Sequence, residues 1–223
     1  MIIVFSHPKG GVGKTLLSFN YAIYNKLNNG DITVIDLDGQ HSISNFNNIR
    51  NAVGLKPVLD ILQFKEPNEF LSYLKTVDEN KKIIIDTGGF DSAFNRIALA
   101  FSDIIITPVS DSPVEIMRLL DFDRILNEIS KNINRNLKTY IVINRIHPSL
   151  TNLNFIKNPL RGKERFKFLD SIVRDRARIK FSVAQGGAVF EDDGAKRDEK
   201  AISELTDLFN EIENIIIAQK TKE

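Results

Sequence analysis

A short segment near the start of the chain combines two lysines, three glycines and a threonine: Lys9-Gly10-Gly11-Val12-Gly13-Lys14-Thr15. Glycines let successive backbone N–H groups turn toward an anion, and a helix that follows such a loop adds the positive end of its dipole. Lys14 is placed to reach the β- and γ-phosphates of a nucleotide, and the Thr15 hydroxyl to hold Mg²⁺. The segment therefore predicts a site for a nucleoside triphosphate and magnesium.

Carboxylates follow two apolar segments further along the chain. Asp36 and Asp38 come after residues 32–35, and Asp86 comes after residues 83–85. In open α/β sheets, ligands bind beyond the carboxyl ends of the strands, so these acids are expected near the glycine loop. Asp86 has the Walker B arrangement, in which a carboxylate binds Mg²⁺ through water. The alternative is that all three are polar residues that merely follow buried strands.

The elements that position these side chains can be read from the spacing of apolar residues. Strands are expected at Ile2–Phe5 and over 32–36, 81–86, 103–109, 139–144 and 165–170, and helices over 15–27, 115–129 and 201–218. We also expect short surface helices over 57–62 and 68–74, and a polar linker over 154–163. This alternation predicts an α/β fold: one domain over 1–223 with a doubly wound, mostly parallel sheet flanked by helices.

Composition narrows the class of protein. The chain has 223 residues with 42% hydrophobic and 26% charged residues, which is ordinary for a globular protein that buries a sizeable core. Cysteine is absent, so disulfides, thiolate metal sites and iron–sulfur clusters are excluded. We expect a protein of the reducing cytoplasm, with neither signal peptide nor membrane span. The net charge is only +1, so any nucleic-acid binding needs a local basic patch.

The loop also carries a family resemblance. A strict P-loop has glycine where this chain has Pro8, but KGGVGKT resembles the deviant Walker A motif of the ParA/MinD superfamily of P-loop ATPases. The resemblance implies that Lys9 reaches across a nucleotide-sandwich dimer to the partner's phosphates. It implies a nucleotide-binding set of Lys9, Gly10, Gly11, Val12, Gly13, Lys14, Thr15, Leu16, Asn144 and Arg145. Leu16 departs from the family, which often has a second hydroxyl residue there touching the α-phosphate.

Two further segments resemble the family's switches. DLDGQ, residues 36–40, is similar to switch I, which implies that Asp38 orients the attacking water and that Asp36 helps to organise the magnesium shell. Asp86 and the glycines after it resemble switch II. The implied catalytic residues are Lys9, Lys14 and Asp38, and the implied metal site comprises Thr15, Asp36, Asp38 and Asp86.

The residues at the end of the strand over 139–144 bear on which nucleotide base the site prefers. In the family an asparagine here, matched by Asn144 and followed by Arg145, hydrogen-bonds the adenine edge. A guanine site would need an Asn-Lys-x-Asp pattern, but position 147 is His147. ATP is therefore favoured over GTP. The alternative is an asparagine that simply caps the next turn.

The clearest basic patch lies over residues 161–180, where eight basic residues stand against three acidic ones. Such a patch could neutralise DNA phosphates without reading sequence. The candidate contacts are Arg174, Arg176, Arg178 and Lys180. A solvated basic face is the alternative, and Arg176 would then serve the nucleotide or the fold.

The resemblance is closest to the short plasmid-type ParA proteins. It implies an ATP-dependent DNA-partition ATPase that dimerises on ATP and Mg²⁺, binds DNA nonspecifically on the nucleoid and is stimulated by a centromere-binding, ParB-like adaptor. The alternatives are a MinD-like membrane-associated positioning ATPase and a metabolic ATP-dependent ligase of the same fold. MinD-like proteins end in a basic amphipathic helix. Residues 201–218 carry an acidic polar face instead, which favours a helix that packs on the fold and no membrane partner.

Overall fold

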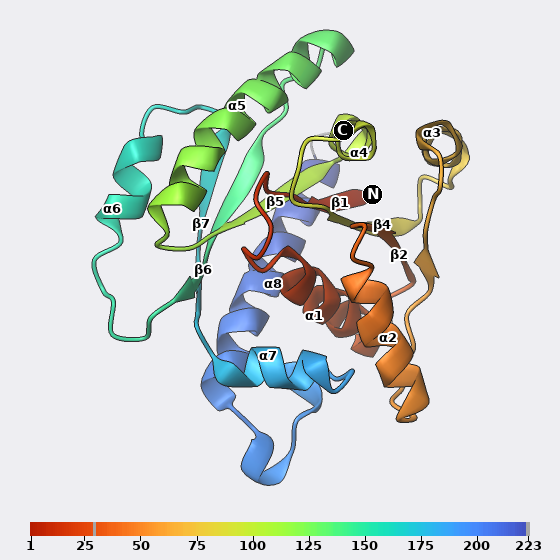
Figure 1. Cartoon of the computed structure of the whole chain (residues 1–223), viewed down its shortest axis with the longest axis vertical. Helices are drawn as coiled ribbons and strands as arrows, with labels where there is room; N and C mark the ends of the chain where they lie inside the picture. The colour runs from red at the N-terminus through yellow and green to blue at the C-terminus, as the bar shows by residue number, and fades with distance from the viewer. Residues whose placement is uncertain (29, 222–223) are drawn as a thin grey trace.

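A single parallel sheet forms the centre of the molecule (Figure 1). The computed structural model describes residues 1–28 and 30–221, and in this part of the chain seven strands lie in the order β3-β2-β4-β1-β5-β6-β7. Every neighbouring pair is parallel. The strands are β1 (Ile2–Phe5), β2 (Ile32–Leu37), β3 (Ile61–Leu62), β4 (Lys82–Thr87), β5 (Ile104–Val109), β6 (Thr139–Ile146) and β7 (Phe166–Arg174).

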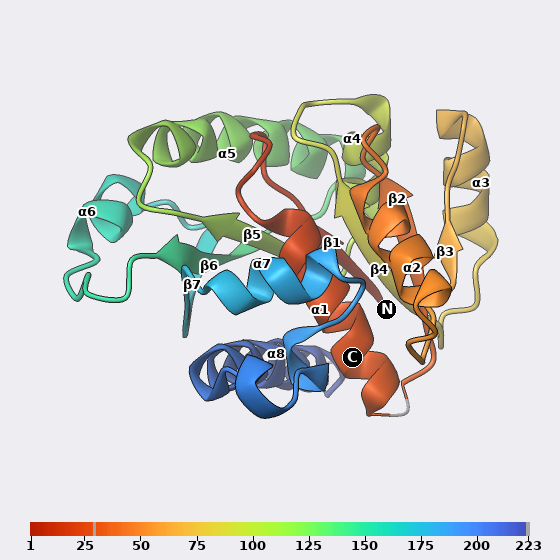
Figure 2. The same ribbon diagram turned by 60° about the horizontal axis from the view of Figure 1, so that its bottom comes forward.

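Helices cover both faces of the sheet (Figure 2). One buried cluster joins the sheet to α1 (Lys14–Leu27), α2 (Ser42–Ala52), α7 (Ala177–Ala184) and α8 (Glu199–Lys220). A second cluster, on the opposite face, joins it to α3 (Pro67–Thr76), α4 (Ala93–Phe101), α5 (Pro113–Ile133) and α6 (Asn154–Lys157). Consecutive strand residues alternate between the clusters, with Ile3 and Phe5 in the first and Ile2 and Val4 in the second. The predicted doubly wound α/β fold is confirmed.

The strand order brings the three predicted functional segments together. β1 lies beside β4 with Phe5 opposite Asp86, and β4 lies beside β2 with Asp36 opposite Asp86. Because all three strands run in the same direction, the segments that follow them leave the sheet at the same edge. The loop after β1 therefore faces the acids at the ends of β2 and β4.

Two of the sequence expectations for local structure are wrong. Residues 57–62 form a loop and the short edge strand β3, which pairs with Val34 and Ile35 of β2. The side-chain amide of Asn47 also holds this segment extended, because it accepts from the Leu59 amide at 2.9 Å and donates to the Leu59 carbonyl at 3.0 Å. Residues 154–163 contain α6 and the 3₁₀ turn η1 (Asn158–Leu160) rather than only a linker. Three apolar side chains anchor that segment in the second cluster: Leu153, Ile156 and Leu160.

The acidic face of α8 does more than contact solvent. Glu211 accepts hydrogen bonds from the backbone amides of Asp170 and Ser171 at 2.8 and 3.0 Å, and Glu204 accepts one from the amide of Arg174 at 2.8 Å. These amides belong to β7, the last strand of the sheet, so α8 covers donors that an edge strand leaves unpaired. The prediction that this helix packs on the fold is confirmed by its buried apolar side. No helix in the described part of the chain is long and apolar enough to cross a membrane.

Candidate nucleotide-binding site

The glycine loop joins β1 to α1 and ends in a conformation that only glycine adopts easily. Gly13 is the N-cap of α1 with φ 100°, and a Cβ on it would lie 2.3 Å from the side-chain nitrogen of Asn144. Both the left-handed backbone and the close neighbour therefore exclude larger residues. Val12 is fully buried, while a Cβ at Gly10 or Gly11 would meet nothing within 4 Å. The loop is thus anchored at Val12 and Gly13, with open space at the two glycines before them.

Lys14 lies under this loop as a buried cation. Its Nζ donates to the carbonyls of His7 and Lys9 at 3.3 and 3.1 Å, and only 4% of the residue is exposed. Burial lowers the pKa of Lys14, while Asp86, Asp38 and Glu115 oppose that effect. The ammonium group is therefore held in place by weak neutral acceptors that the oxygens of a phosphate could replace.

Thr15 and Asp86 form the pair expected of a magnesium site. The Thr15 hydroxyl donates to Oδ2 of Asp86 at 2.7 Å, and the other carboxylate oxygen is buried without a hydrogen-bond partner among the described residues. Burial raises the pKa of Asp86 to about 7, against the Thr15 hydrogen bond and the charge of Lys14. A buried carboxylate with one unused oxygen beside a threonine hydroxyl is a donor set that suits Mg²⁺, a cation bound through few protein oxygens together with phosphate. These residues fit the metal.

Asp36 is occupied in holding the start of α2. Its carboxylate accepts from the Ser44 hydroxyl at 2.5 Å, from the Ser44 amide at 3.3 Å and from the Asp38 amide at 3.2 Å. With 2% exposure it lies beside Asp86 and raises the pKa of that carboxyl. Asp36 therefore orders the segment that carries Asp38. It also places a negative charge beside Asp86, the carboxylate predicted to bind the metal.

The loop, Asp38 and the segment after β4 enclose one cleft of about 510 Å³, within the usual size of a small-molecule site. The predicted residues that line it are Gly10, Gly11, Gly13, Lys14, Thr15, Leu16 and Asp38. The remaining lining residues are Gln40 and Gly89, which belong to the segments that resemble the switches, and Ser42, Phe46 and Phe90, which the sequence interpretation did not include. Phe46 lies one turn into α2, so only the approach of that helix to the loop places it here.

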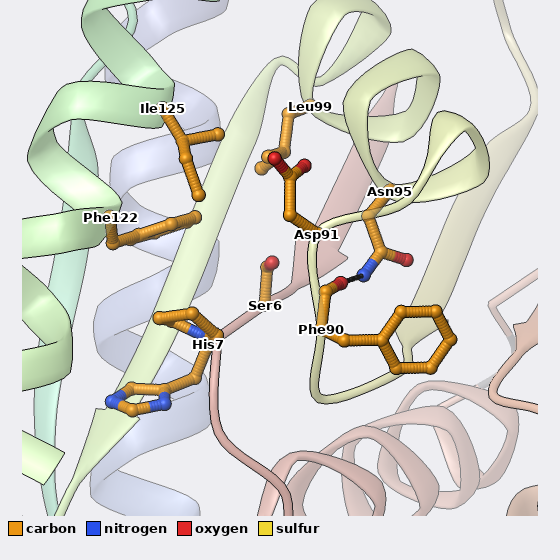
Figure 3. A pocket seen from close by; sticks show the side chains of 9 residues that line it. Ser6, His7, Phe90, Asp91, Asn95, Leu99, Phe122 and Ile125 are labelled. Carbon is orange, nitrogen blue, oxygen red and sulfur yellow. Dashed lines mark hydrogen bonds between the residues drawn. The ribbon is translucent and has the colours of Figure 1, made fainter.

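The segment after β4 rests directly on the glycine loop. A Cβ on Gly89 would lie 2.4 Å from the backbone nitrogen of Gly10, so a side chain at this position would separate the two loops. Asn95 of α4 holds the same segment from behind, because its side-chain nitrogen donates to the carbonyls of Gly88 at 3.2 Å and of Phe90 at 2.5 Å (Figure 3). Asn95 and Phe90 also line a small cavity behind the loop, and His7 lines that cavity from the β1 side. Asn95 is a positioning residue that the sequence interpretation missed.

Lys9 forms an ion pair inside its own subunit. Its Nζ lies 3.3 Å from Oε1 of Glu115 at the start of α5, and the other Glu115 oxygen accepts from the Ser110 amide at 2.8 Å. Burial pushes the pKa of Glu115 upward, but the hydrogen bonds from Ser110 and Lys9 outweigh it and leave the pKa below its usual value. Glu115 is buried while the Lys9 side chain is 37% exposed. The lysine therefore sits at the protein surface with an anionic partner that a phosphate could displace.

Asn144 and Arg145 approach the loop from the end of β6. The Asn144 side chain donates to the Val12 carbonyl at 2.9 Å and is 3% exposed, and Arg145 donates to the Gly11 carbonyl. Both side chains are thus bonded to the phosphate loop in this structure, and the adenine contact of Asn144 stays a prediction. The two residues brace the loop on the side away from Asp38.

Three of the four basic residues proposed to contact DNA have partners outside the sequence window, and Lys180 pairs with an acid inside it. Arg176 pairs with Glu204 at 2.5 Å, Arg178 pairs with Asp192 at 2.9 Å and Lys180 pairs with Asp175 at 2.5 Å. The guanidinium of Arg174 donates to the carbonyls of His147 and Leu150 at 3.3 and 2.6 Å. Two of the positive charges counted over 161–180 are therefore offset by Glu204 and Asp192, which lie elsewhere in the chain.

Comparisons with known proteins identify the family of the chain. Residues 3–189 match the family described as CobQ/CobB/MinD/ParA nucleotide binding domain. No curated protein sequence matches the chain.

Solved structures share the fold. A Borrelia burgdorferi B31 protein described as a plasmid partition protein, bound to AMPPNP, has a TM-score of 0.69 and 20% identity, over 96% of this chain and 98% of that one. Apo McdA of Cyanothece has a TM-score of 0.72 and 15% identity, over 96% and 98%. The septum site-determining protein MinD of Pyrococcus horikoshii OT3, complexed with Mg-ADP, has a TM-score of 0.73 and 12% identity, over 96% of both chains.

Proposed function

Because the chain belongs to the CobQ/CobB/MinD/ParA nucleotide binding domain family, we propose that it is a partition-type ATPase. It hydrolyses ATP, pairs with a second copy while ATP is bound and associates nonspecifically with DNA in the cytoplasm. The observation that carries the proposal is that Lys14, Thr15 and Asp38 line one cleft and that Asp86 lies against Thr15. Phosphoryl transfer needs such positioning and electrostatics more than it needs covalent chemistry.

Each residue of the cleft has a task in the proposed reaction. The amides of Gly10, Gly11 and Gly13 and the end of α1 hold the phosphates, and Lys14 neutralises their charge. Thr15 and Asp86 hold Mg²⁺, which when bound neutralises charge on the phosphate oxygens. Asp38 orients the attacking water, and the Asp36–Ser44 contacts keep its loop in place.

Lys9 links hydrolysis to pairing. In the proposed dimer, two clefts face each other and Lys9 leaves Glu115 to contact the triphosphate of the partner subunit. The partial exposure of Lys9 and its single ion pair support this role. Loss of the γ-phosphate removes the charge that attracted the lysine, so the dimer separates after hydrolysis.

The proposed biological role is DNA segregation. Among the proteins that share the fold is the Borrelia burgdorferi protein described as a plasmid partition protein. A centromere-binding, ParB-like adaptor would stimulate hydrolysis, and nonspecific DNA on the nucleoid would hold the ATP-bound dimer. The acidic, packed α8 favours this role over a membrane-associated one.

Two variants test the site. Lys14→Ala should abolish binding of a fluorescent ATP analogue, whereas Asp38→Ala should retain ATP and remain dimeric in analytical ultracentrifugation but release no phosphate. Normal hydrolysis by Asp38→Ala contradicts the assignment of the water-orienting residue. A wild-type protein that stays monomeric with a non-hydrolysable analogue and Mg²⁺ contradicts the dimer.

Cosedimentation of the ATP-bound protein tests whether its partner is DNA or a membrane. The ATP-bound wild type should pellet with random-sequence DNA and should not pellet with anionic liposomes. The reverse result favours the MinD-like positioning ATPase, and turnover that requires a small carboxylate substrate favours the ligase.

A further inference from the structure

Several exposed basic residues without an ion-pair partner lie together at the β7 edge of the sheet in the described part of the chain. We propose that four exposed basic residues there form the surface on which duplex DNA binds: Lys138, Lys157, Arg161 and Lys167. We call them the β7-edge surface. The inference rests on the proposed function, which names DNA as a partner, and it moves the contact away from α7.

Charge pairing distinguishes the two regions. The four basic residues of 174–180 face three acids, namely Asp175 within the segment and Asp192 and Glu204 from other elements. Residues 157–167 together with Lys138 hold six basic residues, faced by Glu164 and by Asp123, which pairs with Lys163 at 2.9 Å. In the described part of the chain, none of the four residues of the β7-edge surface has an ion-pair partner.

The neighbours of Arg176 and Arg178 make these arginines costly to release. Glu204 binds the Arg176 guanidinium and also the backbone amide of Arg174. Asp192 pairs with Arg178 and also accepts from the Ser182 hydroxyl at 2.5 Å. A phosphate that took either arginine would leave a partly buried carboxylate without its cation, which opposes binding.

The β7-edge surface carries no such cost, and the fold gathers its members. Thr139, next to Lys138, donates its amide to the carbonyl of Arg165 at 2.8 Å, and Tyr140 lies opposite Lys167 in the β6–β7 ladder. Lys157 lies over the ring of Phe168, with its Nζ 5.6 Å from the ring centre. Phe168 packs on the second cluster and precedes Leu169 of the first, so Lys157 and Lys167 lie on opposite faces of β7 and the surface runs around the edge of the sheet. α6, β6 and β7 occupy the same side of the molecule (Figures 1 and 2).

The β7-edge surface also lies away from the nucleotide-binding cleft. Lys138 precedes the first residue of β6 and Lys167 is near the start of β7, whereas the cleft lies beyond the carboxyl ends of the strands. Two subunits that close cleft to cleft would therefore leave both surfaces exposed. Nonspecific binding to B-DNA weakens with salt, and the slope of log K against log salt is about −0.9 for each phosphate contact. Four contacts per subunit predict a slope of at most about −3.6 for a monomer and twice that for a dimer.

The test compares three charge-matched variants by fluorescence anisotropy on a random-sequence duplex over a salt series, with a non-hydrolysable ATP analogue and Mg²⁺. The edge variant replaces Lys157, Arg161 and Lys167 by Gln. The control replaces Lys56, Lys65 and Lys75, exposed lysines near β3 at the opposite edge. The third variant replaces Arg174, Arg178 and Lys180.

The edge variant should reduce the magnitude of the slope by about 2.7 per subunit, while the other two change it by less than about 1. Unchanged melting temperature and analogue affinity confirm that the variants are folded. An equal loss in the control, or a loss confined to the variant of Arg174, Arg178 and Lys180, overturns the β7-edge surface and leaves the proposed function in place. A wild-type protein that binds no duplex in any nucleotide state overturns the proposed DNA partner itself.

Discussion

Replacing Asp86 by Asn should make the nucleotide-free protein more stable while removing its magnesium site. Asp86 is completely buried at the end of β4, where the Thr15 hydroxyl bonds one oxygen and the other has no partner in the described structure. A buried ionised carboxylate that lacks its cation is unfavourable. Asparagine has nearly the same shape, accepts the same hydrogen bond and carries no charge.

The magnitude follows from the pKa of this carboxyl, which rises from 3.8 to about 7 on folding because of burial. Between these values the folded protein keeps a proton that the unfolded chain has released, so stability falls as pH rises. Each pH unit in this window costs about 1.4 kcal/mol, so ionised Asp86 destabilises the fold by about 4 kcal/mol at pH 8. The substitution should recover that amount, because it removes the ionisation.

His7 makes the stability change with pH in the opposite direction, so its contribution has to be separated from that of Asp86. Burial and the charge of Lys14 lower its pKa from 6.5 to about 4, so the unfolded chain binds the extra proton in that window. Stability from this group rises with pH between those two values, by about 3 kcal/mol in total. The free energy of unfolding of the wild type should therefore change little between pH 4 and 6.5 and should fall above pH 6.5. The difference between the two proteins cancels His7 and isolates Asp86.

Urea denaturation from pH 4 to 8, without nucleotide or divalent cation, measures that difference. The variant should match the wild type at pH 4 and exceed it by about 4 kcal/mol at pH 8. Magnesium with an ATP analogue should stabilise the wild type and add little to the variant. Equal stabilities at pH 8, or a difference that does not change with pH, would refute the argument that Asp86 is a buried charge awaiting a cation.

Two further predictions concern ion pairs. Glu115→Gln keeps the hydrogen bond from the Ser110 amide but loses the attraction for Lys9, so ATP-dependent dimerisation should strengthen by up to about fivefold in sedimentation equilibrium; weaker dimerisation would contradict the proposed competition. Arg50 is fully buried and bonds both oxygens of Glu191 at 2.6 Å, so Arg50→Met should cost about 3–5 kcal/mol in thermal unfolding. Adding Glu191→Met should restore part of that loss, and a double variant no more stable than the single one would contradict the pair.

The cleft itself could be predicted from the sequence because its parts are local. A glycine loop between a strand and a helix needs only neighbouring residues to form, and strands that end in acids deliver them to one edge of a parallel sheet. Lys14, Thr15 and Asp38 accordingly lie together. The sequence did not predict that Asp36 would bond Ser44, since that depends on the first turn of α2 returning to the strand end.

The features that the sequence did not predict depend on contacts between residues far apart in the chain. Residues 57–62 read as a helix in isolation, but a free ladder on β2 and the Asn47 side chain make them extended. The spacing of Leu153, Ile156 and Leu160 was a usable signal for the α6 segment that the polar residues around it obscured. The charge count over 161–180 was correct as arithmetic, yet Glu204 and Asp192 lie outside the window and cancel part of it.

The charges around the loop share one property that bears on how the protein would respond to its ligand. Lys14 is bonded to two carbonyls, Lys9 to Glu115 and Asp86 to Thr15, so each group already has a partner within the subunit. A triphosphate with its cation could replace all of these partners at once, with phosphate oxygens for the lysines and a metal for the carboxylate. Only the exchange at Lys9 involves a side chain with substantial exposure, and it is therefore the one that a second subunit could reach. Binding of nucleotide and pairing of subunits are then coupled through Lys9, because the phosphate that draws it from Glu115 would belong to the partner.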